Sequence, residues 1–336
     1  MTHLHKILVV GTGSIGERHV RCFLVTGRAT VAICEPNAAI RQIVNDRYDI
    51  RNDYGNLEEA MASRFDAAVI ATPAPLHIPQ AMVLARQQSH LLIEKPLSLD
   101  QTGIEELQKI IATNHQVVGI GYNWRAMPGL AAIRDALIRG TLGRPVQIRV
   151  VCGQHFPTYR PAYRETYYRD RTQGGGAIQD ALTHAINAGE WLVGPIDRLV
   201  ADCDHQVLPG VEVEDTVHVI ARHGSVMGAY LFNQHQAPNE LTVTLVGDRA
   251  TARFEAHKSR WQIMTEPDTS WDIHKLQTED RDALYVRQAQ HFLDAIEGRG
   301  QPLCSFEQGI QTLRTNLAVI AACDCGSGWM KVDKDQ

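Results

Sequence analysis

The sequence predicts an α/β chain in which a doubly wound parallel sheet is followed by a part built mainly from antiparallel strands. Three observations predict it. Through residue 120, short apolar runs alternate with helical patterns, and a glycine-rich turn follows the first run. From residue 146 onward, apolar and polar residues alternate along the strand-like segments. Continuous apolar runs are typical of parallel strands covered by helices, whereas alternation is typical of antiparallel strands with one open face.

Length and composition limit the class of protein. A chain of 336 residues fits two domains of roughly 150 residues each, and the change of pattern places them at residues 1–121 and 122–336. The formal charge of −5 disfavours non-specific nucleic-acid binding, which needs clustered basic residues. No apolar run approaches the ~20 residues that span a bilayer, so we expect no membrane partner.

The amino terminus and the cysteines indicate a cytoplasmic protein. Met1–Lys6 leads directly into a strand-like run, which leaves no room for a signal peptide. The seven cysteines are few and odd in number, as expected of thiols that stay reduced. Cys323 and Cys325 are the only close pair in the sequence, and no second pair completes a zinc site, so we expect no metal.

The elements of the first domain are predicted in chain order. Strands are expected at Ile7–Val10, Thr30–Cys34, Ala67–Ala71, Leu91–Ile93 and Val117–Ile120. Helices are expected at Ala38–Arg47, Leu57–Ala62, Ile78–Gln88 and Thr102–Asn114, together with one that opens after the glycine-rich turn. This alternation predicts βαβ units and a parallel sheet.

The turn after the first strand has the spacing G-x-G-x-x-G. Its residues are Gly11, Thr12, Gly13, Ser14, Ile15 and Gly16. The motif is weak by itself, but here it follows a strand and opens a helix, which is the context that dinucleotide binding needs. Gly11 allows a tight turn, Gly13 allows a pyrophosphate to approach the backbone, and Gly16 allows the helix to pack closely on the strand. The first domain is therefore expected to be a Rossmann domain.

Glu35 ends the second strand, nineteen residues after Gly16. A carboxylate at this position accepts hydrogen bonds from the adenosine ribose and repels a 2′-phosphate, which favours NAD as the cofactor. Arg41 is near enough in the sequence to accommodate such a phosphate, so NADP is the alternative. A solvated charge at the end of a strand is the other interpretation of Glu35.

Two more segments follow strands, at the edge where ligands of open α/β sheets bind. One is Ala71–His77, which contains Thr72, Pro73 and His77, and the other is Glu94-Lys95-Pro96. A lone lysine is usually a solvated surface charge. Its position between Glu94 and Pro96 at the end of a strand makes Lys95 a candidate functional residue.

The second domain is expected to begin with a helix and to continue with alternating strands. The helix is predicted at Gly129–Arg139, and the strands at Val146–Gln154, Leu199–Val207, Thr216–Arg222, Met227–Gln236, Glu240–Val246 and Thr251–His257. Helices return at Tyr285–Glu297 and Phe306–Cys323. Strands of this kind leave one sheet face open, and another subunit is the expected cover.

A helix is predicted to begin near Ala177, directly after three glycines. Asp180 and His184 are four residues apart, so they are expected to share one face of it, and Asn187 follows on the same face. A nearby carboxylate orients a histidine and raises its proton affinity. The alternative is a local helix pair that contributes ~0.3 kcal/mol to stability.

Aromatic and arginine residues are densest between His155 and Arg171. Arginine forks suit phosphates and carboxylates, and tyrosines suit sugar rings. We therefore take Tyr163 and Arg164 as candidate substrate-binding residues, together with Tyr122 and Arg125 from the segment that interrupts the strand pattern. An oligomer contact or a structured loop explains the cluster equally well.

The motifs, in this order and over essentially the whole chain, resemble the Gfo/Idh/MocA family of oxidoreductases. The matching pieces are Gly11–Gly16, Ala71-Thr72-Pro73 with His77, Glu94-Lys95-Pro96, Gly174–His184, Val213–Thr216 and Val246–Thr251. The resemblance implies a Rossmann domain followed by a substrate-binding α+β domain with a large open, mainly antiparallel sheet that commonly forms dimers or tetramers. It implies NAD(P)-dependent oxidation or reduction of a sugar, polyol or sugar nucleotide. It also implies that Lys95 contacts nicotinamide ribose and substrate, and that the bond before Pro96 is often cis.

These observations lead to a hypothesis for the reaction. His184 acts as the general base, Lys95 orients the substrate hydroxyl and lowers its pKa, and Asp180 positions both substrate and His184. Family members often carry Asp where this chain has Asn187, which could alter substrate preference. The predicted cofactor-binding residues are Gly11, Thr12, Gly13, Ser14, Ile15, Gly16, Glu35, Thr72, Pro73, His77, Glu94 and Lys95. The predicted substrate-binding residues are Lys95, Tyr122, Arg125, Tyr163, Arg164, Asp180 and His184.

Two other functions are compatible with the same fold. One is NAD-dependent glycoside hydrolysis, in which oxidation of the sugar is transient and no NADH accumulates. The other is a cofactor-binding regulator without turnover, since a fold does not guarantee an activity. The presence of Lys95, Asp180 and His184 disfavours the regulator.

Overall fold

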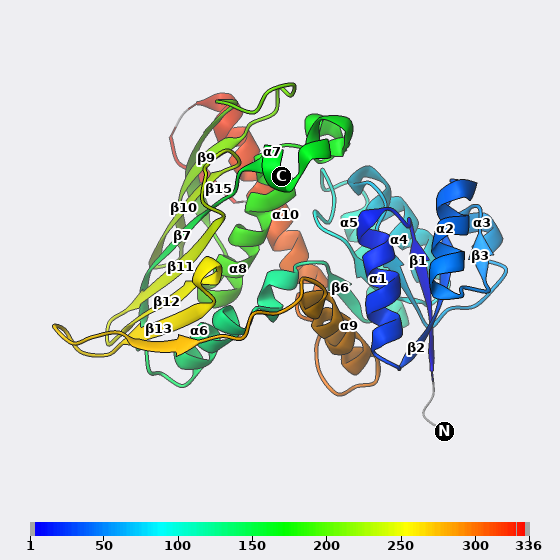
Figure 1. Cartoon of the computed structure of the whole chain (residues 1–336), viewed down its shortest axis with the longest axis horizontal. Coiled ribbons are helices and arrows are strands. Elements are labelled where there is room, and N and C mark those ends of the chain that lie inside the picture. The colour runs from blue at the N-terminus through cyan, green and yellow to red at the C-terminus, as the bar shows by residue number, and fades with distance from the viewer. Residues whose placement is uncertain (1–3, 327, 333–336) are drawn as a thin grey trace. The chain divides into compact units, whose positions relative to one another are not determined.

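The structure, a computed structural model, describes residues 4–326 and 328–332. The chain forms two compact units (Figure 1). The first runs to Asn123 and takes in Asp280–Gly309, and the second comprises Trp124–Glu279 and the chain from Ile310 onward. The domains expected from the sequence place Asp280–Gly309 with the second part, whereas it clusters with the first unit. The assignment of cofactor binding and substrate binding to the two parts stays a prediction.

The first unit is built on a parallel sheet of six strands in the order β3-β2-β1-β4-β5-β6. The strands are β1 (His5–Val10), β2 (Ala29–Cys34), β3 (Asp53–Tyr54), β4 (Ala67–Ile70), β5 (His90–Ile93) and β6 (Val118–Ile120). In the register, Val9 lies opposite Ile33 of β2 and Val69 of β4. This strand order is that of the dinucleotide-binding doubly wound fold, in which ligands bind at the carboxyl edge where the order reverses.

Helices complete the first unit. They are α1 (Ser14–Val25), α2 (Ala38–Tyr48), α3 (Leu57–Ala60), α4 (His77–Arg86), α5 (Ile104–Asn114) and α9 (Asp282–Ile296). Helix α9 comes from the late segment of the chain and packs on α1, where Phe292 meets Phe23 edge-on at 6.3 Å. Ala289, Phe292 and Leu293 belong to the same buried cluster as residues of β1 and β2. The core of this unit therefore includes residues far apart in the sequence.

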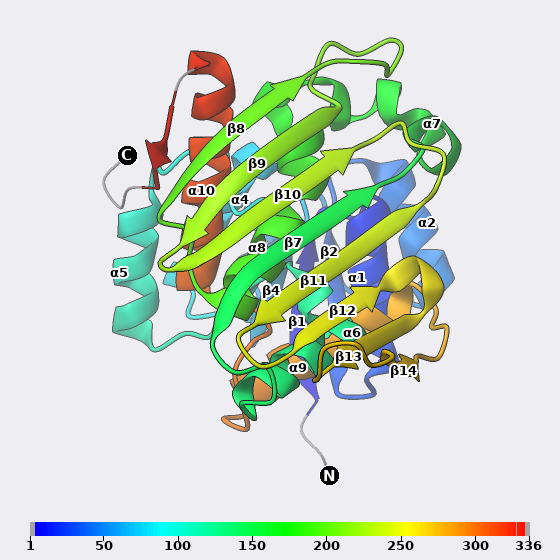
Figure 2. The same ribbon diagram turned by 90° about the vertical axis from the view of Figure 1, so that its left-hand side faces the viewer.

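The second unit is built on a sheet of nine strands, ordered β14-β13-β12-β11-β7-β10-β9-β8-β15. They are β7 (Pro145–Gly153), β8 (Arg198–Asp204), β9 (Thr216–His223), β10 (Val226–Asn233), β11 (Glu240–Gly247), β12 (Thr251–Glu255), β13 (Arg260–Met264), β14 (Asp272–Lys275) and β15 (Met330–Lys331). All neighbouring pairs are antiparallel except β7 with β10, which is parallel. Figure 2 shows the strands side by side, with α8 and α10 behind them. The predicted fold class is confirmed.

The helices of the second unit cover one face of this sheet. The longest are α6 (Pro128–Ile138), α8 (Thr183–Val193) and α10 (Phe306–Cys325), and a short α7 covers Phe156–Tyr159. Leu130, Ile186 and Val319 from these helices lie in one buried cluster with residues of β7 to β12. The first residues of α10 belong to the first unit and the remainder to the second.

The sequence pattern missed some elements and misplaced others. It did not predict β3, β13, β14 and β15, because two of them have only two residues and the others carry no clear alternation. The predicted strand Thr251–His257 ends at Glu255, where a 3₁₀ turn begins. The predicted strand Leu199–Val207 ends at Asp204. The helix expected near Ala177 begins as a π-helical turn at Ile178–Leu182 and becomes α-helical only at Thr183.

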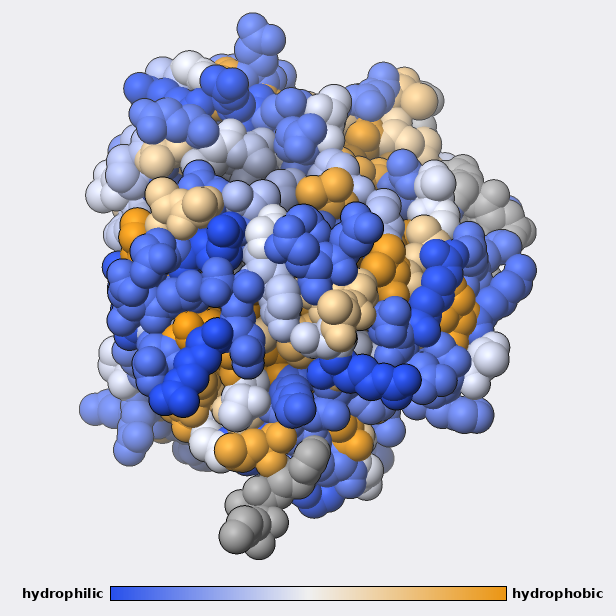
Figure 3. Space-filling model, turned by 90° about the vertical axis from the view of Figure 1, so that its right-hand side faces the viewer, coloured by the Kyte–Doolittle hydropathy of each residue, from blue (hydrophilic) through white to orange (hydrophobic). Residues whose placement is uncertain are grey.

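Among the helices that the structure describes, none combines the length and the apolar character needed to cross a membrane. On the face in Figure 3 hydrophilic residues predominate, and the hydrophobic ones form small separate groups. Scattered hydrophobic residues of this kind are ordinary on a water-exposed surface.

Candidate active site

The glycine-rich turn lies between β1 and α1, as predicted, and two of its glycines are required by the fold itself. Gly11 has φ of +81°, in the left-handed region that favours glycine. At Gly16, a Cβ would lie 1.8 Å from the carbonyl oxygen of Gly11. A side chain at either position would distort the turn, so these two glycines set its shape.

Gly13 differs, because nothing in the protein requires it to lack a side chain. Its φ of −61° is accessible to any residue, and a Cβ there would meet no atom within 4 Å. It is the N-cap of α1 and makes no side-chain cap hydrogen bond. The backbone N–H groups at the start of α1 thus adjoin open space, which is the arrangement that binds the pyrophosphate of a dinucleotide. The residues present fit that group.

The carboxylate of Glu35 is fixed against the glycine-rich turn. Its Oε2 accepts hydrogen bonds from the backbone N–H of Thr12 at 2.9 Å and from the Thr12 hydroxyl at 3.3 Å, and its Oε1 accepts one from Asn37 N–H at 2.9 Å. The residue is 8% exposed. Glu35 is therefore a held carboxylate beside the turn rather than a solvated strand-end charge.

Arg41, the residue that could accommodate a 2′-phosphate, is already hydrogen-bonded to other groups of the protein. Its guanidinium donates to the carbonyl of Glu35 at 2.6 Å and to Asp53 at 2.8 Å. These contacts direct the guanidinium to the second and third strands. The arrangement favours NAD over NADP, because a negative carboxylate adjoins the turn while the nearby cation is already paired.

His77 joins the two other predicted cofactor segments. Its ring nitrogens lie 2.8 Å from the carbonyl oxygen of Thr72 and 2.9 Å from that of Pro96. Burial lowers the pKa of His77, although hydrogen bonds to both carbonyls favour the charged form. Pro73 follows Thr72 and precedes a 3₁₀ turn. The segments after β4 and β5 are thereby tied together.

Lys95 follows a buried acid–base pair that the sequence did not predict. Glu94 accepts at 2.7 Å from His19 of α1, and its other oxygen accepts from the Lys95 backbone N–H at 3.1 Å. Burial opposes ionisation of Glu94, but His19 and then Lys95 outweigh it and lower the pKa of Glu94. Glu94 is thus an anion that fixes the backbone at Lys95. The peptide bond between Lys95 and Pro96 is cis, as the resemblance implies.

In the second unit, Asp180 and His184 each contact an aromatic residue. Asp180, 6% exposed, accepts a hydrogen bond from the Tyr167 hydroxyl at 2.5 Å. The ring of His184 stacks on Trp124 with centroids 5.3 Å apart and planes 12° from parallel. Asp180 lies in the π-helical turn and His184 in the first turn of α8. Such π turns are frequent at functional sites, because they reorient the side chains of a helix.

Asn187 and Arg125 belong to a buried polar network in the same unit. The Arg125 guanidinium donates to Asn187 at 2.7 Å, and Asn187 donates to the Thr312 hydroxyl at 2.9 Å. Thr312 in turn donates to Glu190 at 2.6 Å, and burial raises the pKa of Glu190. Arg125 is 3% exposed. An aspartate in place of Asn187 could not make the donation to Thr312.

Tyr163 and Arg164 both hydrogen bond to the chain at Pro209. The Tyr163 hydroxyl donates to the Pro209 carbonyl at 2.7 Å, and Arg164 donates to the same carbonyl at 2.8 Å. Tyr163 is buried in an aromatic cluster with Phe156 and Tyr168. Within the segment His155–Arg171, Tyr167 is the residue that hydrogen bonds to a predicted catalytic residue, Asp180. The predicted substrate contacts of Tyr163 and Arg164, and of the buried Tyr122, stay predictions.

His19, Trp124 and Tyr167 are the contacts that sequence reasoning missed. His19 lies three residues after Gly16, on the helix that the turn opens, and Trp124 adjoins the predicted Arg125. These two residues therefore lie close in the sequence to predicted site residues. Their partners, Glu94 and His184, are distant in the sequence, so only the fold reveals the pairings.

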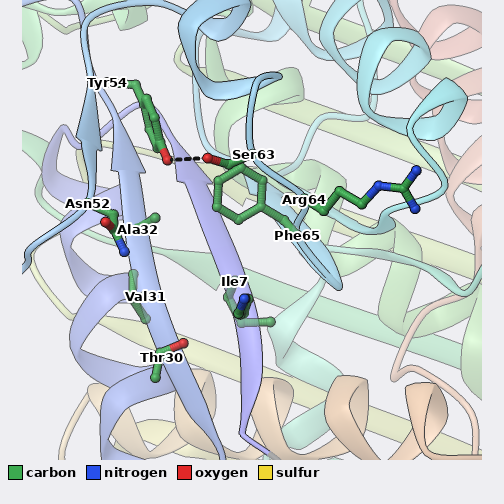
Figure 4. A pocket seen from close by; sticks show the side chains of 10 residues that line it. Ile7, Thr30, Val31, Ala32, Asn52, Tyr54, Ser63, Arg64 and Phe65 are labelled. Atoms are coloured by element: carbon green, nitrogen blue, oxygen red, sulfur yellow. Dashed lines mark hydrogen bonds between the residues drawn. The ribbon is translucent and has the colours of Figure 1, made fainter.

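A pocket of about 300 Å³ in the first unit lies away from these groups (Figure 4). It is lined by Lys6 and Ile7 of β1, by Thr30–Ala32 of β2, and by Tyr54 and Phe65, with Tyr54 hydrogen-bonded to Ser63 at 2.8 Å. Lys6 and Ile7 lie in the amino-terminal half of β1, and Thr30 and Val31 in that of β2. Dinucleotides bind such sheets at the opposite, carboxyl edge.

Two protein-family models match the chain. Residues 5–122 match the GFO/IDH/MocA oxidoreductase family with an NAD-binding Rossmann fold, and residues 130–253 match the GFO/IDH/MocA C-terminal domain. Among curated proteins, the chain is 27% identical over 274 residues to 1,5-anhydro-D-fructose reductase of Ensifer adhaerens, with 78% of each chain covered. It is 23% identical to inositol 2-dehydrogenase of Pseudomonas syringae, covering 87% of this chain and 86% of the other.

Solved structures with similar folds include dehydrogenases with bound cofactor and sugar. Levoglucosan dehydrogenase in complex with NADH and levoglucosan has a TM-score of 0.90 at 19% identity, covering 99% of this chain and 100% of the other. The WlbA dehydrogenase of Bordetella pertussis in complex with NADH and UDP-GlcNAcA has a TM-score of 0.85 at 22% identity, covering 99% of both. At identities this low, the likeness shows the fold alone.

Proposed function

The chain belongs to the Gfo/Idh/MocA family of NAD-binding oxidoreductases, and from that premise we propose that it transfers hydride between NAD and a hydroxyl or carbonyl carbon of a sugar, polyol or sugar nucleotide. The observation that supports NAD as the cofactor is the open space at Gly13, where the start of α1 adjoins the hydrogen-bonded carboxylate of Glu35. The substrate class is supported by relatives named for anhydrofructose and inositol.

The cofactor supplies the hydride chemistry when bound. The protein must then bind the substrate hydroxyl, stabilise the oxygen as negative charge develops, and move its proton. We assign the proton to a ring nitrogen of His184, whose plane is set by Trp124. The Lys95 ammonium stabilises the developing alkoxide, and its backbone is fixed by Glu94. Asp180, held by Tyr167, orients substrate and His184.

Substitutions at the two reactive groups test these roles. His184→Ala and Lys95→Ala should each lower kcat/KM by about 10²- to 10⁴-fold, because each removes a group that acts in the transition state. The matched controls are His291→Ala and Lys109→Ala, which remove exposed side chains of α9 and α5. Formation of NADH is followed by absorbance over a panel of polyols, cyclitols and sugar nucleotides. Unchanged turnover in either site variant would contradict its assignment.

The same measurements separate this function from its alternatives. A glycoside hydrolase of this fold would release an aryl aglycone with no net NADH, and a regulator would bind NAD without turnover of any substrate. A dehydrogenase forms NADH in proportion to the oxidised product.

We also infer that the chain forms a homodimer or homotetramer through the outer face of the nine-stranded sheet. Large apolar side chains on that face are exposed, at 46% for Ile220, 47% for Met227 and 38% for Leu231. They alternate along β9 and β10 with the buried Val219 and Tyr230. Light scattering should give a mass of two or four chains, and Met227→Lys should lower it. The cytoplasmic location expected from the sequence stays a prediction.

A further inference from the structure

A buried histidine of α1 is hydrogen-bonded to the residue that precedes Lys95. His19 lies in the second turn of α1, three residues after Gly16, and is 0% exposed. Its Nε2 lies 2.7 Å from Oε1 of Glu94, which is itself buried and directly follows β5. A contact between an imidazole and a carboxylate thus joins the helix after the glycine-rich turn to the strand end that carries Lys95.

The surroundings of His19 give its ring a single polar contact. The ring centroid lies 6.4 Å from that of Phe23, and the ring meets that of Tyr285 edge-on at 5.5 Å. Within the part of the chain that the structure describes, its Nδ1 is buried without a hydrogen-bond partner. Ionised Glu94 can only accept, so Nε2 carries the hydrogen of the bond between them. A phenyl ring would suit the aromatic neighbours without burying an unpaired nitrogen, so the reason for an imidazole here is the bond to Glu94.

The carboxylate of Glu94 has two further contacts. Its Oε2 accepts a hydrogen bond from the Lys95 backbone N–H at 3.1 Å. Gly121, which follows β6, lies so close that a Cβ there would be 2.8 Å from the carboxyl carbon of Glu94. The absence of a side chain at Gly121 therefore leaves room for the carboxylate, and two hydrogen bonds fix its two oxygens.

Lys95 is the accessible residue of an otherwise buried segment. From Leu91 to Ser98 every residue except Lys95 is buried, and Lys95 is partly exposed. On the side of Lys95 away from Glu94 in the sequence, Nδ1 of His77 lies 2.9 Å from the Pro96 carbonyl oxygen. The backbone is therefore held before and after Lys95, and the freedom that remains is that of its side chain.

We propose that His19 is a positioning residue for Lys95, which acts through Glu94 and does not itself touch the substrate. The proposal rests on the proposed function, in which the Lys95 ammonium stabilises the developing alkoxide. A group that stabilises charge in a transition state must already be in place when the charge forms. His19 belongs to the helix whose first N–H groups adjoin the space assigned to the pyrophosphate, so one element sets the place of both the cofactor and the lysine.

Hydrogen exchange in the free enzyme tests the holding of the backbone without turnover. In His19→Phe, which keeps an aromatic ring and removes the donor, the Lys95 amide should exchange at least about tenfold faster than in the wild type, because Glu94 loses the bond that holds it. In His19→Gln, whose amide N–H lies close to the position of Nε2, the exchange rate should stay near that of the wild type. The amide is followed by NMR of protein labelled with ¹⁵N-lysine.

Kinetics test whether this holding matters to the reaction. In His19→Phe, kcat should fall by about 10- to 100-fold, since the lost hydrogen bond is one to a buried charge, while the Kd for NAD stays at the wild-type value. His19→Gln should keep most of kcat, and His19→Asn, one methylene shorter, should not. Phe23→Leu is the matched control, because it trims a buried apolar residue of the same helix. It should lower the melting temperature and leave kcat near that of the wild type.

The double variant with Lys95→Ala shows whether His19 acts through the lysine. In that background the further loss from His19→Phe should be less than about twofold, because changes along one line of contacts are not additive. A loss as large as in the wild-type background would overturn the proposal, and so would unaltered Lys95 exchange or wild-type kcat in His19→Phe. Should His19→Phe not fold, equal exchange rates and equal kcat in His19→Gln and His19→Asn would overturn it. Wild-type turnover of Lys95→Ala would contradict the role assigned to Lys95 as well, so the two failures are distinguishable.

Discussion

Gly11, Gly13 and Gly16 are equivalent in the sequence motif but not in the structure. The first and last are demanded by the turn, since a Cβ at Gly16 would overlap the Gly11 carbonyl. Gly13 alone is free to carry a side chain as far as the protein is concerned. A ligand that approaches the backbone closely, as proposed above for NAD, would account for the absence of a side chain there.

Gly13→Ala should therefore weaken NAD binding without weakening the fold. We expect the Kd for NAD, measured by fluorescence titration, to rise at least about tenfold, equivalent to about 1.4 kcal/mol, because the added methyl occupies the space assigned to the pyrophosphate. The melting temperature should stay close to that of the wild type. Gly16→Ala is the contrasting variant and should lower it clearly. A Gly13→Ala protein with unaltered NAD affinity would place the pyrophosphate elsewhere.

Tyr167→Phe tests the hydrogen bond that holds Asp180. A hydrogen bond to a charged group contributes about 1.5–3 kcal/mol, so kcat/KM should fall by about 10- to 100-fold if Asp180 must be held in place. The Kd for NAD should not change. Tyr159→Phe, an exposed tyrosine of the same loop, is the control. Equal activity of the two variants would show that Asp180 does not depend on Tyr167.

At this scale, the sequence predicts residues with reactive side chains but not the residues that hold them. Lys95, Asp180 and His184 are predicted because they stand in motifs, and their roles stay predictions. Tyr167 and His19 are not predicted, because a hydroxyl–carboxylate or imidazole–carboxylate contact between distant positions has no local signature. For Tyr163, the arginine-rich loop predicts a sugar contact, and the structure adds a role that the sequence does not predict, a hydrogen bond from its hydroxyl to a backbone carbonyl.

Among the elements, α9 shows how a late segment completes an early sheet. Asp282, at its first turn, accepts from Arg18 at 2.9 Å and from Arg21 on α1. Hydrogen bonding from Arg21, and then from Arg18, outweighs burial and lowers the pKa of Asp282. The carboxylate therefore stabilises the contact between α9 and α1 in its charged form.

Because the pKa of Asp282 is lowered in the folded protein, the direction of the pH dependence of stability follows. The stabilisation is fully present above the ordinary aspartate pKa of about 3.9 and is lost as pH falls from there through the lowered pKa of the folded state. Asp282→Asn should thus melt at a lower temperature than the wild type near pH 6, with a difference that shrinks below about pH 4. Asp135→Asn, which removes an exposed i,i+4 partner of Arg139, should change little. A constant difference from pH 6 to pH 3 would contradict the assignment.

Periodicity predicted most helices and strands of the chain to within a few residues. It failed where an element is too short to show a period, as in β3 and β15, or where helix geometry changes partway. The π-helical turn at Ile178–Leu182 is such a case. Nothing in the residues from Gly174 to His184 distinguishes five-residue from four-residue hydrogen bonding, because the choice depends on packing against the sheet.

For the molecule as a whole, the path of the chain decides which pieces can fold alone. The first unit needs Asp280–Gly309, since Phe292 and Leu293 complete the core under β1 and β2. A fragment of residues 1–123 should show no cooperative thermal transition and no NAD binding. Joining residues 280–309 to it through a flexible linker should restore both, as measured by calorimetry and titration. Cooperative unfolding of 1–123 alone would show that α9 is dispensable.

The fold class was predictable at this scale because it rests on patterns that repeat along the chain. The return of the chain to the first sheet was not predictable, because the amphipathic helix at residues 282–296 would suit the core of either unit. Only side-chain packing, such as Phe292 against Phe23, decides between them.

This discontinuity has a consequence for biosynthesis. The ribosome releases the glycine-rich turn before the helix that completes the sheet, which is made only after the Trp124–Glu279 part of the second unit. Domains generally fold in the order in which they are synthesised. Here the second unit has most of its sheet before the first has its last helix, so the unit that carries the glycine-rich turn is begun first and finished late.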